Sequence, residues 1–112
     1  MKIAVIGSRG LVVDNIGEYI PEGVDEIVSG GARGVDSLAA SYAKANGIKL
    51  TEFLPEYSVY GRGAPLKRNE KIVEYADEVL AFWDGGSRGT LFVINYCEKI
   101  GKKCTVLRPE EI

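Results

Sequence analysis

Three glycine-rich turns, each carrying an arginine, hold the residues of this chain that are best suited to bind a small molecule. They lie at residues 7–10, 29–36 and 84–90, and each follows a hydrophobic run. Glycine lets backbone N–H groups approach a ligand closely, and the N-terminus of a following helix carries partial positive charge. Three turns of this kind predict a site for a small molecule that bears a phosphate.

The turn at residues 84–90 is the strongest candidate for the phosphate itself. Its main-chain N–H groups, the Ser87 and Thr90 hydroxyls and the helix start behind them would together cradle an anion. It is not a P-loop, because the Gly-Lys-Ser/Thr ending is missing. The alternative is a tight turn that only connects a strand to a helix. The ligand-binding residues predicted from this turn are Asp84, Gly85, Gly86, Ser87, Arg88, Gly89 and Thr90.

The other two turns each allow a structural and a functional interpretation. Residues 29–36 resemble a dinucleotide fingerprint only loosely, because the glycine spacing differs. Asp36 either caps the helix that follows or accepts a hydrogen bond from a ribose hydroxyl. Ser8 and Arg9 are either turn residues or ligand contacts. The ligand-binding residues predicted from these turns are Gly7, Ser8, Arg9, Ser29, Gly30, Gly31, Ala32, Arg33, Gly34 and Asp36.

A fourth segment, Arg68-Asn69-Glu70, lies early in a predicted helix. A cation there is disfavoured by the helix dipole, and such a local inconsistency is what a functional arginine would show. The alternative is a solvated charged face. Arg68 and Asn69 are predicted ligand contacts, and Arg68 and Glu70 are catalytic candidates only if the protein is an enzyme. Three aromatic residues either stack on a base or belong to the core: Tyr57, Tyr60 and Trp83.

Hydrophobic runs alternate with helical spacing along the whole chain. The predicted strands are residues 2–6, 26–29, 48–53, 78–83 and 103–107. The predicted helices are residues 14–20, a segment starting at 35, and residues 65–76 and 89–100, with residues 55–65 interpreted as a loop over the site. Strict alternation favours a parallel sheet with helices on both faces. We expect one α/β domain with a Rossmann-like, doubly wound parallel sheet of about five strands in the order 3-2-1-4-5.

This strand order brings the glycine-rich turns together. The order reverses between the first and fourth strands, and ligands of such sheets bind at the reversal, outside the carboxyl ends of the strands. The turns at residues 7–10 and 84–90 would flank that crevice, and the turn at residues 29–36 would lie beside it. The topology therefore predicts a single site at one edge of the sheet.

Composition narrows the classes of function. The 112 residues suit a single domain, and the net charge of −2 argues against nucleic acid as a partner. The absence of histidine excludes Ser-His-Asp and Cys-His catalysis and removes the commonest metal ligand. Cys97 and Cys104 are interpreted as buried, reduced thiols. No residue pattern requires a metal or a cofactor.

Two further expectations concern location and assembly. No apolar run approaches the roughly 18 residues of a membrane span, and the first residues do not form a signal peptide. We therefore expect a cytoplasmic protein without a membrane partner. The predicted helix at residues 89–100 is apolar around most of its circumference, which predicts burial either under the sheet or in a homodimer.

These residues resemble the SLOG superfamily, and in particular its small stand-alone YspA-like group, over most of the chain. Residues 6–9 match the first-loop pattern of that group. Residues 29–36 are very similar to the Ser-Gly-x-Ala-Arg-Gly-Ile-Asp stretch of DNA-processing protein A. Residues 68–70, 76–77 and 85–90 parallel the Arg-Lys, Ala-Asp and Pro-Gly-Gly-x-Gly-Thr series of the lonely-guy phosphoribohydrolases.

The resemblance implies a Rossmann-like fold that binds a nucleotide or a related ligand across these loops. In the phosphoribohydrolases the Gly-Gly-x-Gly-Thr turn holds a 5′-phosphate, and an arginine and a glutamate act on the N-glycosidic bond. Arg68 stands at the arginine position, but Leu91-Phe92-Val93 follows Thr90 where the glutamate would be. Asp84 replaces their proline, and the turn has one extra residue.

Three functions follow from these observations. The first is the binding or sensing of a nucleotide or nucleotide-derived ligand. The alternative is a hydrolase or transferase acting on a nucleotide N-glycosidic bond, in which Asp36, Glu70 or Asp84 replaces the missing glutamate. A less favoured third, by analogy with DNA-processing protein A, is binding of single-stranded DNA.

Overall fold

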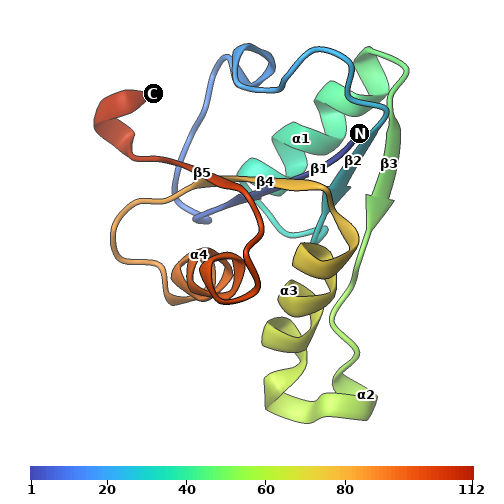
Figure 1. Cartoon of the computed structure of the whole chain (residues 1–112), viewed down its shortest axis with the longest axis vertical. Coiled ribbons are helices and arrows are strands. Elements are labelled where there is room, and N and C mark those ends of the chain that lie inside the picture. Colours follow the sequence, from blue (N-terminus) through green and yellow to red (C-terminus); the bar gives the residue numbers. More distant parts are fainter.

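Five parallel strands form the centre of the computed structural model, which describes residues 1–112 (Figure 1). The strands are β1 (Lys2–Gly7), β2 (Glu26–Ser29), β3 (Lys49–Glu52), β4 (Glu78–Phe82) and β5 (Cys104–Leu107). They lie in the order β3-β2-β1-β4-β5, and every neighbouring pair is parallel. This arrangement confirms the predicted strand order.

Helices cover both faces of the sheet (Figure 1). The α-helices are α1 (Val35–Ala45), α2 (Tyr57–Tyr60), α3 (Ala64–Tyr75) and α4 (Arg88–Ile100), and the 3-10 turns are η1 (Ile16–Glu18), η2 (Gly61–Gly63) and η3 (Pro109–Glu111). Along β1, Ile3 and Val5 pack in one buried cluster with α1, whereas Ala4 and Ile6 pack in another with α3 and α4. This alternation follows from the two-residue period of a strand, and it explains why a strand buried on both faces is continuously apolar. The α/β class and the doubly wound sheet are confirmed.

Residues 14–20 do not form the predicted α-helix, and only the 3-10 turn η1 is present there. A segment this short, interrupted by Gly17 and ended by Pro21, gains too few hydrogen bonds to offset the cost of helix nucleation. Gly17 also packs closely against the Tyr42 ring, where an added Cβ would lie 2.6 Å from a ring carbon. The backbone therefore follows the face of α1 and buries Val13 and Ile16 without forming a helix.

The stretch at residues 55–65 is more regular than the predicted loop. The amides of Val59 and Tyr60 both donate to the Glu56 carbonyl at 3.0 Å, which forms the single turn α2. The turn η2 then leads directly into α3, which has Pro65 near its N-terminus as predicted. The loop prediction was wrong at α2 and η2 because local backbone hydrogen bonds form despite the glycines of this segment.

The helix α4 packs under the sheet through Val93 and Cys97, both fully buried. Leu91 and Ile100 of this helix remain 37% and 43% exposed. Burial under the sheet therefore accounts for part of its apolar surface, and the homodimer stays a prediction. None of the helices has the length and apolar composition that crossing a membrane would need.

Gly7 ends β1 at a point where the backbone touches α1. An added Cβ would lie 2.4–2.8 Å from three carbon atoms of Val35, a residue of the core. We expect Gly7→Ala to destabilise the fold by about 1–3 kcal/mol through overpacking. Chemical denaturation measures this effect. Gly10→Ala is the matched control, because a Cβ at Gly10 meets nothing within 4 Å; equal losses in both variants would contradict the contact.

Candidate ligand-binding site

A cavity of about 450 Å³ opens at the carboxyl edge of the sheet, where the strand order reverses between β1 and β4. This volume is within the range of small-molecule pockets, roughly 300–1,000 Å³. The lining comes from the ends of β1, β2 and β4 and from the first turns of α1, α3 and α4: Ile6, Gly7, Arg9, Gly10, Gly30, Ala32, Asp36, Pro65, Leu66, Arg68, Asn69, Asp84, Ser87, Gly89 and Thr90.

Arg68 joins the first turns of α3 to the loop after β2. Its Nη1 donates to the Gly30 carbonyl at 2.6 Å and to the Phe53 carbonyl at 3.4 Å, and its Nε donates to the Asn69 amide oxygen at 2.8 Å. Gly30 permits this approach, because an added Cβ would lie 2.6 Å from Nη1. Burial lowers the pKa of Arg68 from its ordinary value, although Asp36 opposes that effect. The second amino group, Nη2, makes no hydrogen bond within the protein and is free for a ligand.

Asp36 is a buried carboxylate in the wall of the cavity, only 7% exposed. It lies in the first turn of α1 but does not cap it, since the N-cap is Gly34 with a φ of 73°. Its Oδ2 instead accepts a hydrogen bond from the Ala32 amide at 3.1 Å. Burial raises the pKa of Asp36, and the Ala32 amide and the Arg68 charge offset part of that rise.

The Asp84 side chain accepts hydrogen bonds from two main-chain amides of the turn predicted to bind phosphate. Its Oδ1 accepts hydrogen bonds from the Gly86 and Ser87 amides, each at 2.8 Å, and these bonds hold its pKa below the ordinary value. The Ser8 hydroxyl, buried beneath the turn, accepts from the Asp84 amide at 3.2 Å. The Asp84 carboxylate thus provides these two amides with the negative charge that, from the sequence, a bound phosphate is expected to provide. The amides at the start of α4, those of Arg88 and Gly89, have no partner within the protein.

The structure brings about half of the predicted residues into the cavity. Those that line it are Gly7, Arg9, Gly30, Ala32, Asp36, Arg68, Asn69, Asp84, Ser87, Gly89 and Thr90. Those that do not are Ser8, Ser29, Gly31, Arg33, Gly34, Glu70, Gly85, Gly86 and Arg88. Glu70 pairs with Lys67 at 3.3 Å and does not line the cavity, so its catalytic role stays a prediction. Arg33 and Arg88 lie outside the lining.

Four lining residues were not assigned from the sequence: Ile6, Gly10, Pro65 and Leu66. Gly10 belongs to the first glycine-rich turn, and Pro65 and Leu66 lie within one helical turn before Arg68. Their positions in the sequence could therefore have predicted that they line the same site as these residues. None of the three aromatic candidates lines the cavity. Tyr57 and Tyr60 are exposed, while the Trp83 indole donates to the Ser87 carbonyl at 3.0 Å.

The two thiols and the carboxylates form no further centre. Cys97 is buried and Cys104 is half-buried, and both are free. No group of three or more histidine, cysteine, aspartate or glutamate residues is arranged to hold a metal ion.

The raised pKa of Asp36 has a defined effect on stability. The folded chain holds this proton more tightly than the unfolded chain, so Asp36 costs increasing stability as pH rises above its ordinary pKa of 3.8. An asparagine side chain at this position has no charge to bury, and its oxygen can still accept from Ala32. We expect Asp36→Asn to gain stability relative to the natural chain from about pH 4 to about pH 7, measured by urea denaturation.

Asp77→Asn is the matched control for that experiment. The Lys2 amide donates to the Asp77 carboxylate at 2.8 Å and lowers its pKa. The natural carboxylate therefore contributes stability that is fully present above its ordinary pKa of 3.8 and is lost as the pH falls below that value, so the stability deficit of this variant should be complete at about pH 4 and stay constant up to about pH 7. Parallel pH profiles for the two variants would contradict the assignment.

Comparison with known proteins bears on the identity of this fold. The model of the YspA, cpYpsA-related SLOG family, YAcAr, matches residues 1–60. No significant match was found among curated proteins or among solved structures. The matched segment contains β1, β2 and β3 with the turns at residues 7–10 and 29–36, which are two of the segments on which the resemblance to this group was based. The chain belongs to the YspA, cpYpsA-related SLOG family.

Proposed function

We propose that the cavity between β1 and β4 binds a nucleotide or a nucleotide-derived ligand. The observation that carries the proposal is the pairing of opposite charges in one small cavity. The Arg68 guanidinium offers a free amino group, and the buried Asp36 carboxylate lines the same space. A nucleotide presents both complements, an anionic phosphate and a sugar with hydroxyl donors. Membership of the SLOG family is consistent with this class of ligand.

The contacts suggest how the ligand would lie. Arg9 and Arg68 are the cations of the lining, and the free amides at the start of α4 add partial positive charge. The Gly86 and Ser87 amides already donate hydrogen bonds to Asp84. The phosphate would therefore contact Arg9, Arg68 and the free amides at the start of α4. Asp36 would accept from the sugar, and the apolar Pro65 and Leu66 would contact the base.

Thermal denaturation with AMP, GMP, CMP and UMP tests the proposal. A ligand at about 100 times its Kd stabilises the fold by about 2.7 kcal/mol, and we expect a rise in Tm for at least one of the four. The rise should disappear in Arg9→Ala, since Arg9 is exposed and makes no side-chain hydrogen bond within the fold. Arg33→Ala is the matched control, because Arg33 is a turn arginine outside the lining.

Arg68→Gln is a second variant, which also changes the hydrogen bonds from Arg68 to the Gly30 and Phe53 carbonyls. It should abolish binding measured by calorimetry while circular dichroism shows a native fold. The absence of a Tm shift with all four nucleotides and with nucleotide-derived ligands such as ADP-ribose and NAD⁺, or equal shifts in Arg9→Ala and the natural chain, would overturn the proposal.

A second candidate function, hydrolysis of the N-glycosidic bond, is favoured by one observation. Asp36 is a desolvated carboxylate in the wall of the cavity, and in the proposed binding mode it contacts the sugar. General acid–base catalysis typically contributes 10²–10⁴-fold to a rate. If the protein is a hydrolase, Asp36→Asn should lower the release of free base from AMP by about 10²-fold or more, whereas Glu70→Gln should retain it. Absence of base release by the natural chain would exclude hydrolysis of AMP and leave the binding proposal intact.

A further inference from the structure

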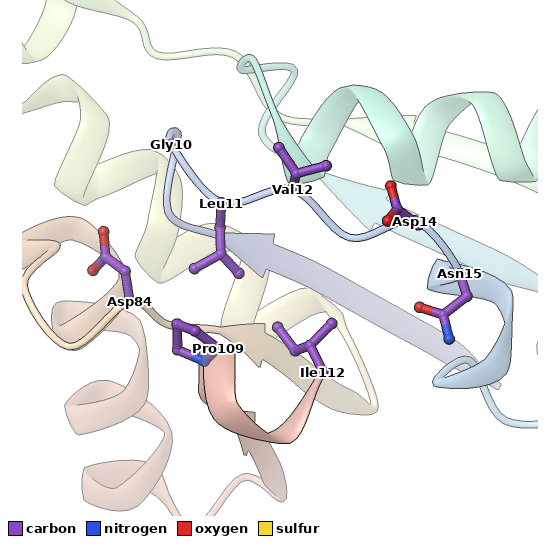
Figure 2. Close-up of a pocket in the computed structure, with 8 residues that line it drawn as sticks. All are labelled: Gly10, Leu11, Val12, Asp14, Asn15, Asp84, Pro109 and Ile112. Carbon is purple, nitrogen blue, oxygen red and sulfur yellow. The ribbon is translucent and has the colours of Figure 1, made fainter.

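A second cavity, of about 850 Å³, lies on the other side of the first glycine-rich turn. It is bounded by the segment after β1 and by the end of the chain after β5 (Figure 2). Figure 2 shows Leu11 in its middle, facing Pro109 and Ile112. Its lining residues are Gly10, Leu11, Val12, Asp14, Asn15, Asp84, Pro109 and Ile112. Among these residues, only Asp84 is predicted from the sequence to belong to a site.

The two cavities meet at the same two residues. Gly10 and Asp84 line both of them, one from the turn after β1 and one from the turn after β4. An added Cβ at Gly10 would meet no atom within 4 Å, so the space beside this residue is open. The two cavities therefore adjoin at this turn, with no side chain of residue 10 between them.

The charges of the two cavities differ. Arg9 and Arg68 line the first cavity, but no lysine or arginine lines the second. The second has an apolar middle with the carboxylates of Asp84 and Asp14 toward its opposite ends (Figure 2). The amides of Gly86 and Ser87 keep Asp84 ionised by lowering its pKa. A phosphate inside the second cavity would be repelled, so a diphosphate would lie beside Arg9 and Arg68 in the first cavity, whereas an uncharged or cationic group would be accepted in the second.

We propose that the two cavities form one bipartite site, whose ligand is a nucleotide joined through its phosphate to a second group that is uncharged or cationic. This inference rests on the proposed function, because the first cavity must hold the nucleotide half. It narrows the ligand class to diphosphate-linked conjugates, such as a nucleotide sugar or a dinucleotide, in place of free mononucleotides.

Calorimetric titration of matched pairs tests this inference. The pairs are AMP with ADP-ribose and with NAD⁺, UMP with UDP-glucose, GMP with GDP-mannose, and CMP with CDP-choline. The measured quantity is the ratio of the mononucleotide Kd to the conjugate Kd for each base. We expect a ratio of about ten or more for at least one pair, since the conjugate gains the contacts of the second cavity.

Gly10→Leu is designed to close the passage between the cavities. Gly10 does not require a left-handed φ and has open space around it, so leucine is compatible with the fold. The ratio should fall to about one. Gly63→Leu is the matched control, because Gly63 also has open space and no left-handed φ but lines neither cavity; its ratio should be unchanged.

A charge variant gives an independent readout. Asp14 is exposed, lines only the second cavity and makes no ion pair or side-chain hydrogen bond within the fold. Asp14→Lys should lower the ratio for the cationic conjugates, NAD⁺ and CDP-choline, more than for ADP-ribose and UDP-glucose.

Two results would overturn the inference, and they are distinguishable. If a mononucleotide binds as tightly as its conjugates, or if Gly10→Leu leaves the ratio unchanged, the bipartite site fails and the proposed nucleotide site stands. If no mononucleotide and no conjugate binds to the natural chain, the proposed function fails and the inference fails with it.

Discussion

The parallel pairing of β1 with both β2 and β4 is the constraint on which the rest of the structure depends. Ala4 pairs with Val28 on one side and with Val79 on the other, so the three strands end at the same edge. The loops that follow them have to turn at that edge, and they are the three glycine-rich turns. Because β1 is buried on both faces, the edge is also held rigidly between α1 on one side and α3 and α4 on the other.

The cavity at this edge of the sheet is lined by both positive and negative side chains. Arg68 crosses from α3 to the Gly30 carbonyl, and its charge lies near the buried Asp36. Asp84, which follows β4, is held by the Gly86 and Ser87 amides of the turn before α4. The strand ends therefore present two kinds of carboxylate. Desolvation raises the pKa of Asp36, and amide donors lower the pKa of Asp84.

That division explains why the site differs from a phosphate cradle built on main-chain amides alone. A carboxylate on the Gly86 and Ser87 amides competes with any anion for the same donors. In the proposed site, the side chains of Arg9 and Arg68 would then be the principal attraction for a phosphate. The same carboxylate borders the second cavity, so one residue shapes the charge of both spaces.

The sequence alone determined the fold class, the strand order, the glycine-rich turns and the edge at which they meet. Each of these depends on local information: continuous apolar runs make buried parallel strands, and glycines mark the turns between them. Short segments were less predictable, because the 14–20 segment and the stretch at residues 55–65 lie near the limit at which a helix can nucleate. Their conformations depend on packing partners such as Tyr42, which lies far from Gly17 in the sequence.

Only the tertiary structure decided which of the predicted side chains share the cavity. Arg68 donates to a carbonyl 38 residues away, and Ser8 accepts from an amide 76 residues away. Glu70 is close to Arg68 in sequence but pairs with Lys67 outside the cavity. The second cavity also depends on distant segments, since its walls come from the chain after β1 and the chain after β5. Spacing along a sequence specifies the edge of the sheet, but side-chain direction and burial at that edge are set by contacts between elements.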